Sequence, residues 1–343
     1  MSFSVGIIGL PNVGKSTLFK ALTKIPVDIA VYPFTTIHPN VGVVRVPDKR
    51  LEEIAKVIKP EKSTPTIIEF VDIAGLVKGA HKGEGLGNQF LTHIRNCDAI
   101  VEVVREFEDA NVEHVDGAVD PEKDIGTVQV ELLMKDLETL EGLISKVEKE
   151  EKDKKSLKRI EFLRKIKDWV SQGNLISELN LTEEEKSEIK EYQFLTQKPL
   201  LYVLNTDGKA EALPAKIKYL AMNLKDEEGF SELSDKEQQE LGLKSKLDQL
   251  IVDCYNILDL ITFFTIAGLK ETRAWTLKKG LTAPLAGGIV HSDFQEKFIK
   301  AETINWQKLV ESGNWHKARE LGWLKTAGKD YLVQDGDVIE FRI

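Results

Sequence analysis

The sequence predicts an α/β protein of three parts: a domain with a mostly parallel sheet, a helical hairpin inserted into it, and a C-terminal α+β module. Three observations lead to this prediction. Short apolar segments alternate with helical segments over the first 120 residues, apolar residues then recur at steps of four and three, and strand-like segments return near the end. We place the first domain at 1–123 and 196–258, the hairpin at 124–195 and the C-terminal module at 259–343.

The composition is that of a soluble globular protein. Of its 343 residues 42% are apolar, which is enough for a core in each of about two or three domains. The net charge of −9 argues against general binding to DNA or other nucleic acid. Cys97 and Cys254 lie far apart and form no metal or disulfide pattern, as is typical of a reducing compartment. With no signal sequence and no apolar run near the roughly 18 residues that span a bilayer, we expect a cytoplasmic protein that makes no membrane contact.

The most informative motif is the segment 9–17, which matches the phosphate-binding pattern G-x-x-x-x-G-K-[ST]. It follows an apolar run typical of a buried strand, and it precedes a helical segment whose N-terminus can face an anion. Gly9 and Gly14 allow the backbone to turn its N–H groups toward phosphate oxygens. Lys15 adds a charge for the β- and γ-phosphates, and Ser16 can bind Mg²⁺. We therefore expect the nucleotide to bind at Asn12, Val13, Gly14, Lys15, Ser16 and Thr17.

Two further segments complete a predicted site for Mg²⁺ and the γ-phosphate. The irregular loop 32–40 contains Thr36, whose hydroxyl we assign to Mg²⁺, with Thr35 as the alternative. The strand predicted at 66–71 is followed by Asp72, which can hold Mg²⁺ through a water, and by Gly75, whose N–H can bond the γ-phosphate. The pattern D-x-x-G is a weak signal alone, but downstream of a phosphate loop it indicates a switch-type nucleotidase.

The residue after Gly75 bears on the mechanism of hydrolysis. Ras-like GTPases carry a glutamine there that orients the attacking water, whereas this chain has Leu76. A leucine side chain neither donates nor accepts a hydrogen bond, so another group must hold the water. The polar loop 107–120 contains His114, although an isolated loop histidine is usually only solvated.

Recognition of the base is expected at residues 205–208, after the strand predicted at 198–205. Guanine-specific nucleotidases of this class carry N-K-x-D there, and the aspartate accepts two hydrogen bonds from guanine. Here Thr206 replaces the lysine and Gly208 replaces the acid, so the guanine-reading motif is absent. The candidates for contact with the base are Asn205, Thr206 and Asp207.

The remaining segments give the hairpin and the C-terminal module. Apolar residues at 133, 137, 140, 144 and 147, and then at 157, 160, 163 and 166, predict two antiparallel helices. The basic residues between 154 and 167 can meet an RNA backbone, but the acidic residues among them favour a solvated face. The last strand of the first domain is predicted at 216–223. The C-terminal module is predicted to have strands at 261–266, 272–277 and 337–342 and helices at 292–301 and 305–321, with no catalytic cluster of its own.

Over nearly its whole length the chain resembles the YchF/Obg-like ATPases of the translation-factor class of P-loop GTPases. The resemblance rests on 9–17, 34–40, 72–77, 83–91 and the tail 328–337. It implies a P-loop nucleotidase domain with a coiled-coil insertion and a C-terminal β-grasp domain of the TGS type.

The resemblance also implies an activity and several residue roles. Members hydrolyse ATP in preference to GTP and associate with the ribosome and its RNA. A histidine matching His114 is proposed to act in hydrolysis, which makes His114 the leading candidate for holding the water and His81 the second. With Lys15 and Gly75, His114 forms the predicted catalytic set. Asn12 matches an asparagine that accompanies K⁺ activation in related nucleotidases. One position departs from the family pattern, because Gly208 stands where members carry a glutamate that reads the base.

Three functions follow as hypotheses. The first is a Mg²⁺-dependent and K⁺-assisted ATPase switch that binds the ribosome and acts in translation or stress regulation. The second is a conventional GTPase of the same fold, in which backbone groups near Thr206 select the base. The third is a ribosome-binding scaffold whose nucleotide turns over slowly, since Leu76 removes the usual water-orienting group.

Overall fold

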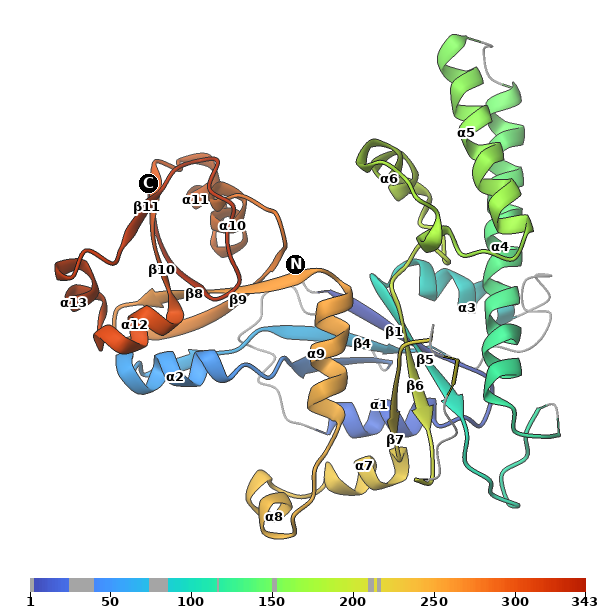
Figure 1. Ribbon diagram of the computed structural model, residues 1–343, viewed down its shortest axis with the longest axis horizontal. Coiled ribbons are helices and arrows are strands. Elements are labelled where there is room, and N and C mark those ends of the chain that lie inside the picture. The colour runs from blue at the N-terminus through green and yellow to red at the C-terminus, as the bar shows by residue number, and fades with distance from the viewer. Residues whose placement is uncertain are drawn as a thin grey trace.

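The structure is a computed structural model, and it describes residues 3–24, 40–73, 86–115, 117–149, 153–208, 213–214 and 217–343. Two six-stranded sheets lie side by side along the chain's long axis, and a helical hairpin projects at the end away from the second sheet (Figure 1). Among the described residues no helix combines the length and the apolar character needed to cross a bilayer.

The first sheet is mostly parallel, as predicted. Its order is β2 (Val41–Arg45), β4 (Ile67–Asp72), β1 (Ser4–Ile8), β5 (Ala99–Arg105), β6 (Leu200–Asn205) and β7 (Tyr219–Met222). Among the strands of this sheet that the structure describes, only β2 runs antiparallel to its neighbour. All seven residues of β5 are buried, which is the expected consequence of a nearly continuous apolar run at the centre of a parallel sheet.

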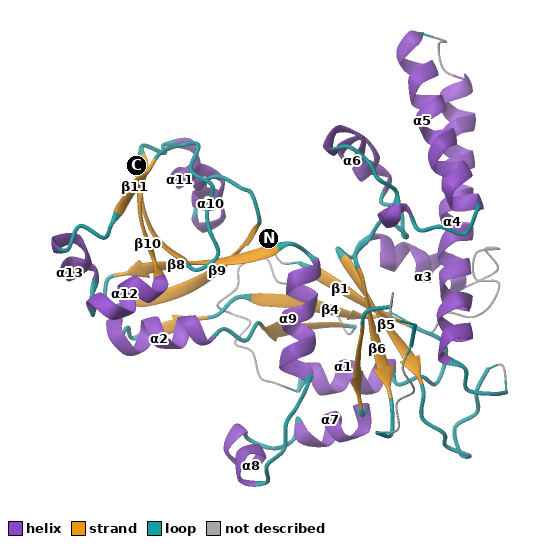
Figure 2. Cartoon of the chain, viewed as in Figure 1, coloured by secondary structure: helices purple, strands orange, loops and turns teal. Residues whose placement is uncertain are grey.

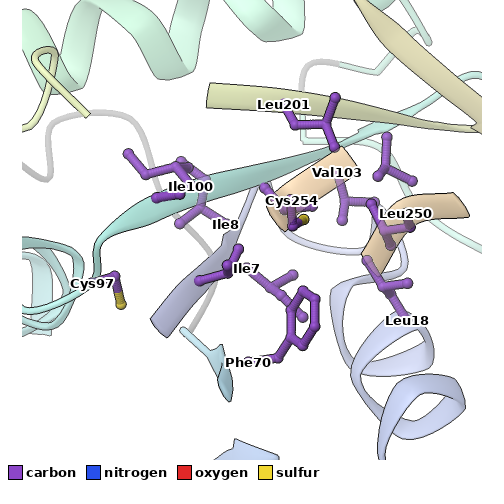
Figure 3. Packing of buried hydrophobic residues seen from close by; sticks show 14 of the residues in the cluster. Ile7, Ile8, Leu18, Phe70, Cys97, Ile100, Val103, Leu201, Leu250 and Cys254 are labelled. Atoms are coloured by element: carbon purple, nitrogen blue, oxygen red, sulfur yellow. The ribbon is translucent and has the colours of Figure 1, made fainter. Parts of the chain in front are cut away.

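Helices cover this sheet and bury its apolar side chains. They are α1 (Lys15–Thr23), α3 (Leu86–Arg95), α7 (Leu224–Phe230) and α9 (Leu247–Ile257), whereas the short polar helix α8 (Asp235–Glu240) contributes no described residue to this core. Leu18 of α1 and Leu250 of α9 enter the same core as Phe70 of β4 (Figure 3). Cys97 and Cys254 are free, buried thiols in that core.

The predicted hairpin is formed by α4 (Pro121–Lys149) and α5 (Lys154–Ser171), followed by α6 (Glu183–Ile189). Leu140, Ile144, Leu163 and Ile166 make up its seam. Leu157 was predicted to lie in the seam, but it is 56% exposed, so the apolar contact between the helices begins further along α5.

Ion pairs occupy several of the basic side chains of α5. Arg164 lies 2.8 Å from Glu148, Lys167 lies 2.8 Å from Glu141, and Arg159 lies 2.9 Å from Glu191. These pairs favour the interpretation of a solvated face over that of an RNA-binding strip.

The second sheet contains one strand from the N-terminal half of the chain. Its order is β11 (Lys325–Ala327), β10 (Lys300–Asn305), β12 (Asp337–Arg342), β8 (Leu260–Ala267), β9 (Glu271–Lys278) and β3 (Lys62–Thr64). The preceding helix α2 (Lys49–Ile58) packs with it, because Leu51 and Ile54 share a core with Phe264 and Leu309. Residues 49–64 therefore pack with the C-terminal module. The sequence-based boundaries assign these residues to the first domain, and those boundaries stay a prediction.

Two helix predictions in the C-terminal module were wrong in extent. The helix predicted at 292–301 is α11 (Ser292–Glu296), after α10 (Ala283–Val290), and residues from 300 onward form β10 instead. The helix predicted at 305–321 is two helices, α12 (Trp306–Ser312) and α13 (Trp315–Glu320). Gly313 separates them with a φ of 84°, a left-handed conformation that ends a helix, and Asn314 caps the next one.

Candidate nucleotide-binding and hydrolysis site

The phosphate loop lies at the carboxyl edge of the first sheet, where parallel-sheet proteins bind their ligands. The loop leaves β1 after Ile8, and the arrowheads of β5 and β6 point to the same edge, beside α1 and α7 (Figure 2). The residues predicted for this site thus come from strands that are neighbours in space although they are far apart in sequence.

Two glycines of the loop are required by close contacts. A Cβ on Gly9 would lie 2.4 Å from the Val103 carbonyl oxygen, and a Cβ on Gly14 would lie 2.6 Å from Asn205 Nδ2. Both residues also have positive φ angles, 144° and 106°. The loop therefore keeps its path only with glycine at these positions.

The predicted magnesium ligands that the structure describes lie together. The Ser16 hydroxyl donates to the Asp72 carboxylate at 3.3 Å. A hydroxyl and a carboxylate are hard oxygen donors, so this pair fits Mg²⁺. Burial raises the pKa of Asp72, while the Ser16 hydrogen bond and the nearby Lys15 charge lower it. Thr36, Thr35, Gly75 and His81 lie outside the described residues, so their assignments stay predictions.

Lys15 is a buried cation at the start of α1. Its Nζ donates to the Leu10 carbonyl oxygen at 2.7 Å, so the amine lies within the loop. Burial lowers the pKa of Lys15 to about 8, and the Asp72 charge opposes this shift. An anion beside Lys15 would favour its charged form, which is the electrostatic reason for a lysine in a phosphate loop.

Asn205 connects the phosphate loop with α7. Its Nδ2 donates to the Val13 carbonyl oxygen at 2.9 Å, and its Oδ1 accepts from the Leu224 N–H at 3.1 Å. The side chain is buried, and both of its bonds are to the protein backbone. Asn205 therefore holds the phosphate end and the base end of the site together, and its predicted contact with a base remains a prediction.

The turn after Asn205 has a backbone conformation that favours glycine at position 208. Gly208 has a φ of 100°, and its N–H donates to the Thr206 hydroxyl at 3.1 Å. A glutamate at this position would be strained in that conformation. Asp207 is exposed beside it.

A cleft of about 630 Å³ extends from the phosphate loop across this turn. Its lining includes Asn12, Gly14, Lys15, Ser16, Thr17, Asn205, Thr206 and Asp207 from the predicted set. It also includes Phe107, Glu108, Asp109, Val112, Asn223, Leu224, Lys225 and Glu228, which sequence reasoning did not select. Their place in the chain could have indicated them. The first four residues follow β5 and the others follow β7, and both strands end at the edge of the sheet where the ligand is expected to bind.

Buried Arg105 shapes the segment after β5. Its guanidinium donates to the carbonyl oxygens of Phe107 at 3.1 Å and Val112 at 3.0 Å, and it lies over the Phe107 ring. This segment leads to Glu113, whose carbonyl oxygen accepts a hydrogen bond from Asn12 Nδ2 at 3.2 Å. This hydrogen bond thus joins the loop that carries His114 to Asn12 of the phosphate loop.

His114 is buried rather than solvated. Its Nε2 lies 2.9 Å from Asp124 Oδ2, and the two side chains are only 5% and 4% exposed. Asp124 belongs to the first turn of α4, and sequence reasoning treated it only as the start of the hairpin. Val13, the remaining residue of the predicted set, is a buried part of the loop.

The fold and this site together define a P-loop nucleotidase of the GTPase class, with a helical hairpin inserted before β6 and a second C-terminal sheet. Residues 4–157 match the family described as 50S ribosome-binding GTPase, and residues 260–343 match YchF-GTPase_C, described as a protein of unknown function.

Similar proteins cover the whole chain. The Ribosome-binding ATPase YchF of Bacillus subtilis (strain 168) is 47% identical over 100% of this chain and 99% of its own length. That of Escherichia coli O157:H7 is 45% identical, with 99% of both chains covered. The solved structure of the Schizosaccharomyces pombe YchF GTPase has a TM-score of 0.88 at 34% identity, covering 99% of this chain and 98% of that chain. The chain belongs to the YchF family, as the resemblance predicted.

Proposed function

We propose that this protein is a ribosome-binding switch of the cytoplasm that hydrolyses ATP to ADP and phosphate. The bacterial relatives carry the name ribosome-binding ATPase, which supports both the substrate and the partner. The site supports the chemistry, because its phosphate loop, its magnesium-binding pair and the His114 loop meet at one edge of the sheet.

In this proposal the phosphate end is bound by the loop and by Lys15. The N–H groups of residues 12–17 and the Lys15 ammonium bind the β- and γ-phosphate oxygens. Ser16, Thr36 and Asp72 would hold Mg²⁺, the last through water, and the bound ion would neutralise charge on those oxygens. Gly75 would donate its N–H to the γ-phosphate.

The water that attacks the γ-phosphate needs a group to orient it, since Leu76 offers none. We assign this role to His114. The observation that carries the assignment is the hydrogen bond from Asn12 to Glu113, because it ties the residue next to His114 to the loop that binds the phosphates. The turnover number of a His114→Ala variant tests it.

We expect that variant to hydrolyse ATP at least about 100-fold more slowly, the lower end for the loss of one polar group acting on the reacting water. Its affinity for ATP should stay within about twofold of the unchanged protein, because His114 does not line the cleft described above. A turnover number equal to that of the unchanged protein would remove His114 from the mechanism.

Asn12 is the proposed ligand of K⁺. Asn12 is an exposed residue of the phosphate loop, and the Glu113 carbonyl, which accepts a hydrogen bond from it, is a further oxygen of the type that K⁺ prefers. K⁺ bound there would supply positive charge beside the phosphates, much as an arginine finger does. We expect K⁺ to raise turnover relative to Na⁺, and Asn12→Ala to abolish the difference. Stimulation that survives in the variant would place the K⁺ effect elsewhere.

GTP is the competing substrate. The S. pombe relative is titled a GTPase, whereas the bacterial relatives are named ATPases. We favour ATP because the chain lacks the aspartate of the N-K-x-D motif, which accepts hydrogen bonds from guanine. Gly208 stands at that position and has no carboxylate. The relative affinities for the two nucleotides decide between these functions.

The remaining alternative is a scaffold whose ribosome binding does not depend on nucleotide. Lys15→Ala removes the charge that binds the phosphates, so a switch should lose the nucleotide dependence of its ribosome binding. Co-sedimentation of this variant with ribosomes, with and without ATP, measures that dependence. Undiminished binding by the variant would favour the scaffold.

A further inference from the structure

A buried group of three ionisable side chains joins the His114 loop, the first sheet and the base of the hairpin. His114 comes from the loop, Glu102 from the centre of β5, and Asp124 from α4. All three are at least nine-tenths buried. The short contact within the group is the 2.9 Å hydrogen bond between His114 Nε2 and Asp124 Oδ2.

We propose that Asp124 is a positioning residue for hydrolysis, which fixes the direction and the tautomer of the His114 ring; this inference rests on the assignment of His114 to the attacking water. A carboxylate can only accept from Nε2, so the proton of a neutral imidazole must be on Nε2. Nδ1 is then the nitrogen that can accept a hydrogen bond, as required of a group that orients or deprotonates water. Aspartate has the same part beside histidine in serine hydrolases.

Glu102 is the second carboxyl group of the cluster, and its surroundings favour its neutral form. Burial, and secondly the neighbouring charge of Asp124, raise the pKa of Glu102 well above its ordinary value. Two ionised carboxylates in one buried group repel each other, so one of them keeps its proton. Because its surroundings favour the neutral form of Glu102, Asp124 is the carboxyl group that we take as the acceptor of the hydrogen bond from His114.

The element that carries Asp124 makes it a rigid support. Val128 and Leu132 follow on the same face of α4 and enter the core of the first sheet. The Asp124 carboxylate is therefore held by a packed helix, whereas His114 belongs to a loop. The hydrogen bond between them restricts the orientation of the imidazole ring.

Asp124→Asn keeps the shape of the side chain but removes its charge, and its amide group can donate to Nε2 and so stabilise the wrong tautomer. We expect kcat for ATP to fall at least about tenfold with KM unchanged. In a His114→Ala background the same substitution should change kcat less than about twofold, because its effect passes through His114. The matched control is Asp136→Asn on the same helix. Its buried carboxylate accepts hydrogen bonds from the N–H groups of Leu195 and Thr196 and from the Thr196 hydroxyl, away from His114, so kcat should not change.

The outcomes separate the two hypotheses. If His114→Ala slows hydrolysis but Asp124→Asn does not, or accelerates it, the positioning role is refuted while the proposed function stands. An equal loss from Asp124→Asn in both backgrounds also refutes it. If His114→Ala itself has normal turnover, the assignment of His114 fails.

A second measurement needs no variant and so does not depend on whether Asp124→Asn folds. The ¹⁵N chemical shifts of the His114 ring in the full-length protein report which nitrogen is protonated. At a pH where the ring is neutral we expect the proton on Nε2. A ring with its proton on Nδ1 would contradict the proposed role of Asp124.

Discussion

Replacing Asn205 by alanine tests whether this residue holds the site together or reads the base. The substitution removes the donor to the Val13 carbonyl and the acceptor of the Leu224 N–H. Each of these backbone groups would then be buried without that partner, at a cost of about 1–3 kcal/mol. Taking the lower half of that range for both groups, the link between the phosphate loop and α7 should weaken by roughly 2–4 kcal/mol.

Hydrogen exchange measured by mass spectrometry reports this loss locally and does not require the whole chain to unfold in one step. A loss of about 2 kcal/mol corresponds to roughly 30-fold faster exchange, and we expect it both in the phosphate loop and at the start of α7. Asn223→Ala is the matched control. Its side chain caps α7 through the N–H groups of Lys225 and Asp226, so its loss should speed exchange only in α7.

Nucleotide affinity supplies the second readout. Because both bonds of Asn205 are to backbone, Asn205→Ala should weaken ATP and GTP alike and leave the ratio of their affinities within about twofold. Unchanged exchange in the phosphate loop, or a large change in that ratio, would refute the linking role and favour direct base recognition.

Three further predictions follow from the site. Gly14→Ala places a Cβ 2.6 Å from Asn205 Nδ2 at a positive φ, so calorimetry should show ATP binding at least about tenfold weaker; normal affinity would contradict the described loop. Arg105→Lys keeps the positive charge but loses the guanidinium N–H groups that donate to the carbonyl oxygens of Phe107 and Val112. The 106–113 segment should then be less ordered and kcat should fall severalfold. Normal activity would show that this segment does not need the support of Arg105. Because the folded-state pKa of Glu102 is raised, its stabilising contribution is complete below the unfolded pKa of about 4.3 and is lost as pH rises through the folded pKa. Glu102→Gln cannot ionise, so its melting temperature should rise relative to the unchanged protein between acidic and neutral pH; a difference independent of pH would refute the buried-acid assignment.

Much of the nucleotide-binding domain could be predicted because its signals are local. The phosphate loop needs glycine at two positions for steric reasons, and apolar runs such as that of β5 suffice to mark buried strands. The helical hairpin could be predicted equally well, since the apolar residues of its seam recur along one face of each helix.

The features that were missed depend on partners distant in sequence. Residues 300–305 form a strand because β12 and β11 lie on either side, which no local pattern reveals. Likewise β3 is defined by its pairing with β9, more than 200 positions further along the chain. The contact between Asp124 and His114, on which the proposed role of Asp124 rests, depends on the fold, because the sequence context of Asp124 is that of an ordinary helix start.

The affinity of this site for the two bases decides whether it is an ATPase site. Isothermal titration of the nucleotide-free, full-length protein with ATP and with GTP, both in the presence of Mg²⁺ and K⁺, gives the two affinities under identical conditions. We expect tighter binding of ATP, because residues 205–208 lack the acid that reads guanine. Tighter binding of GTP would contradict it and make this chain a GTPase with a different means of base recognition.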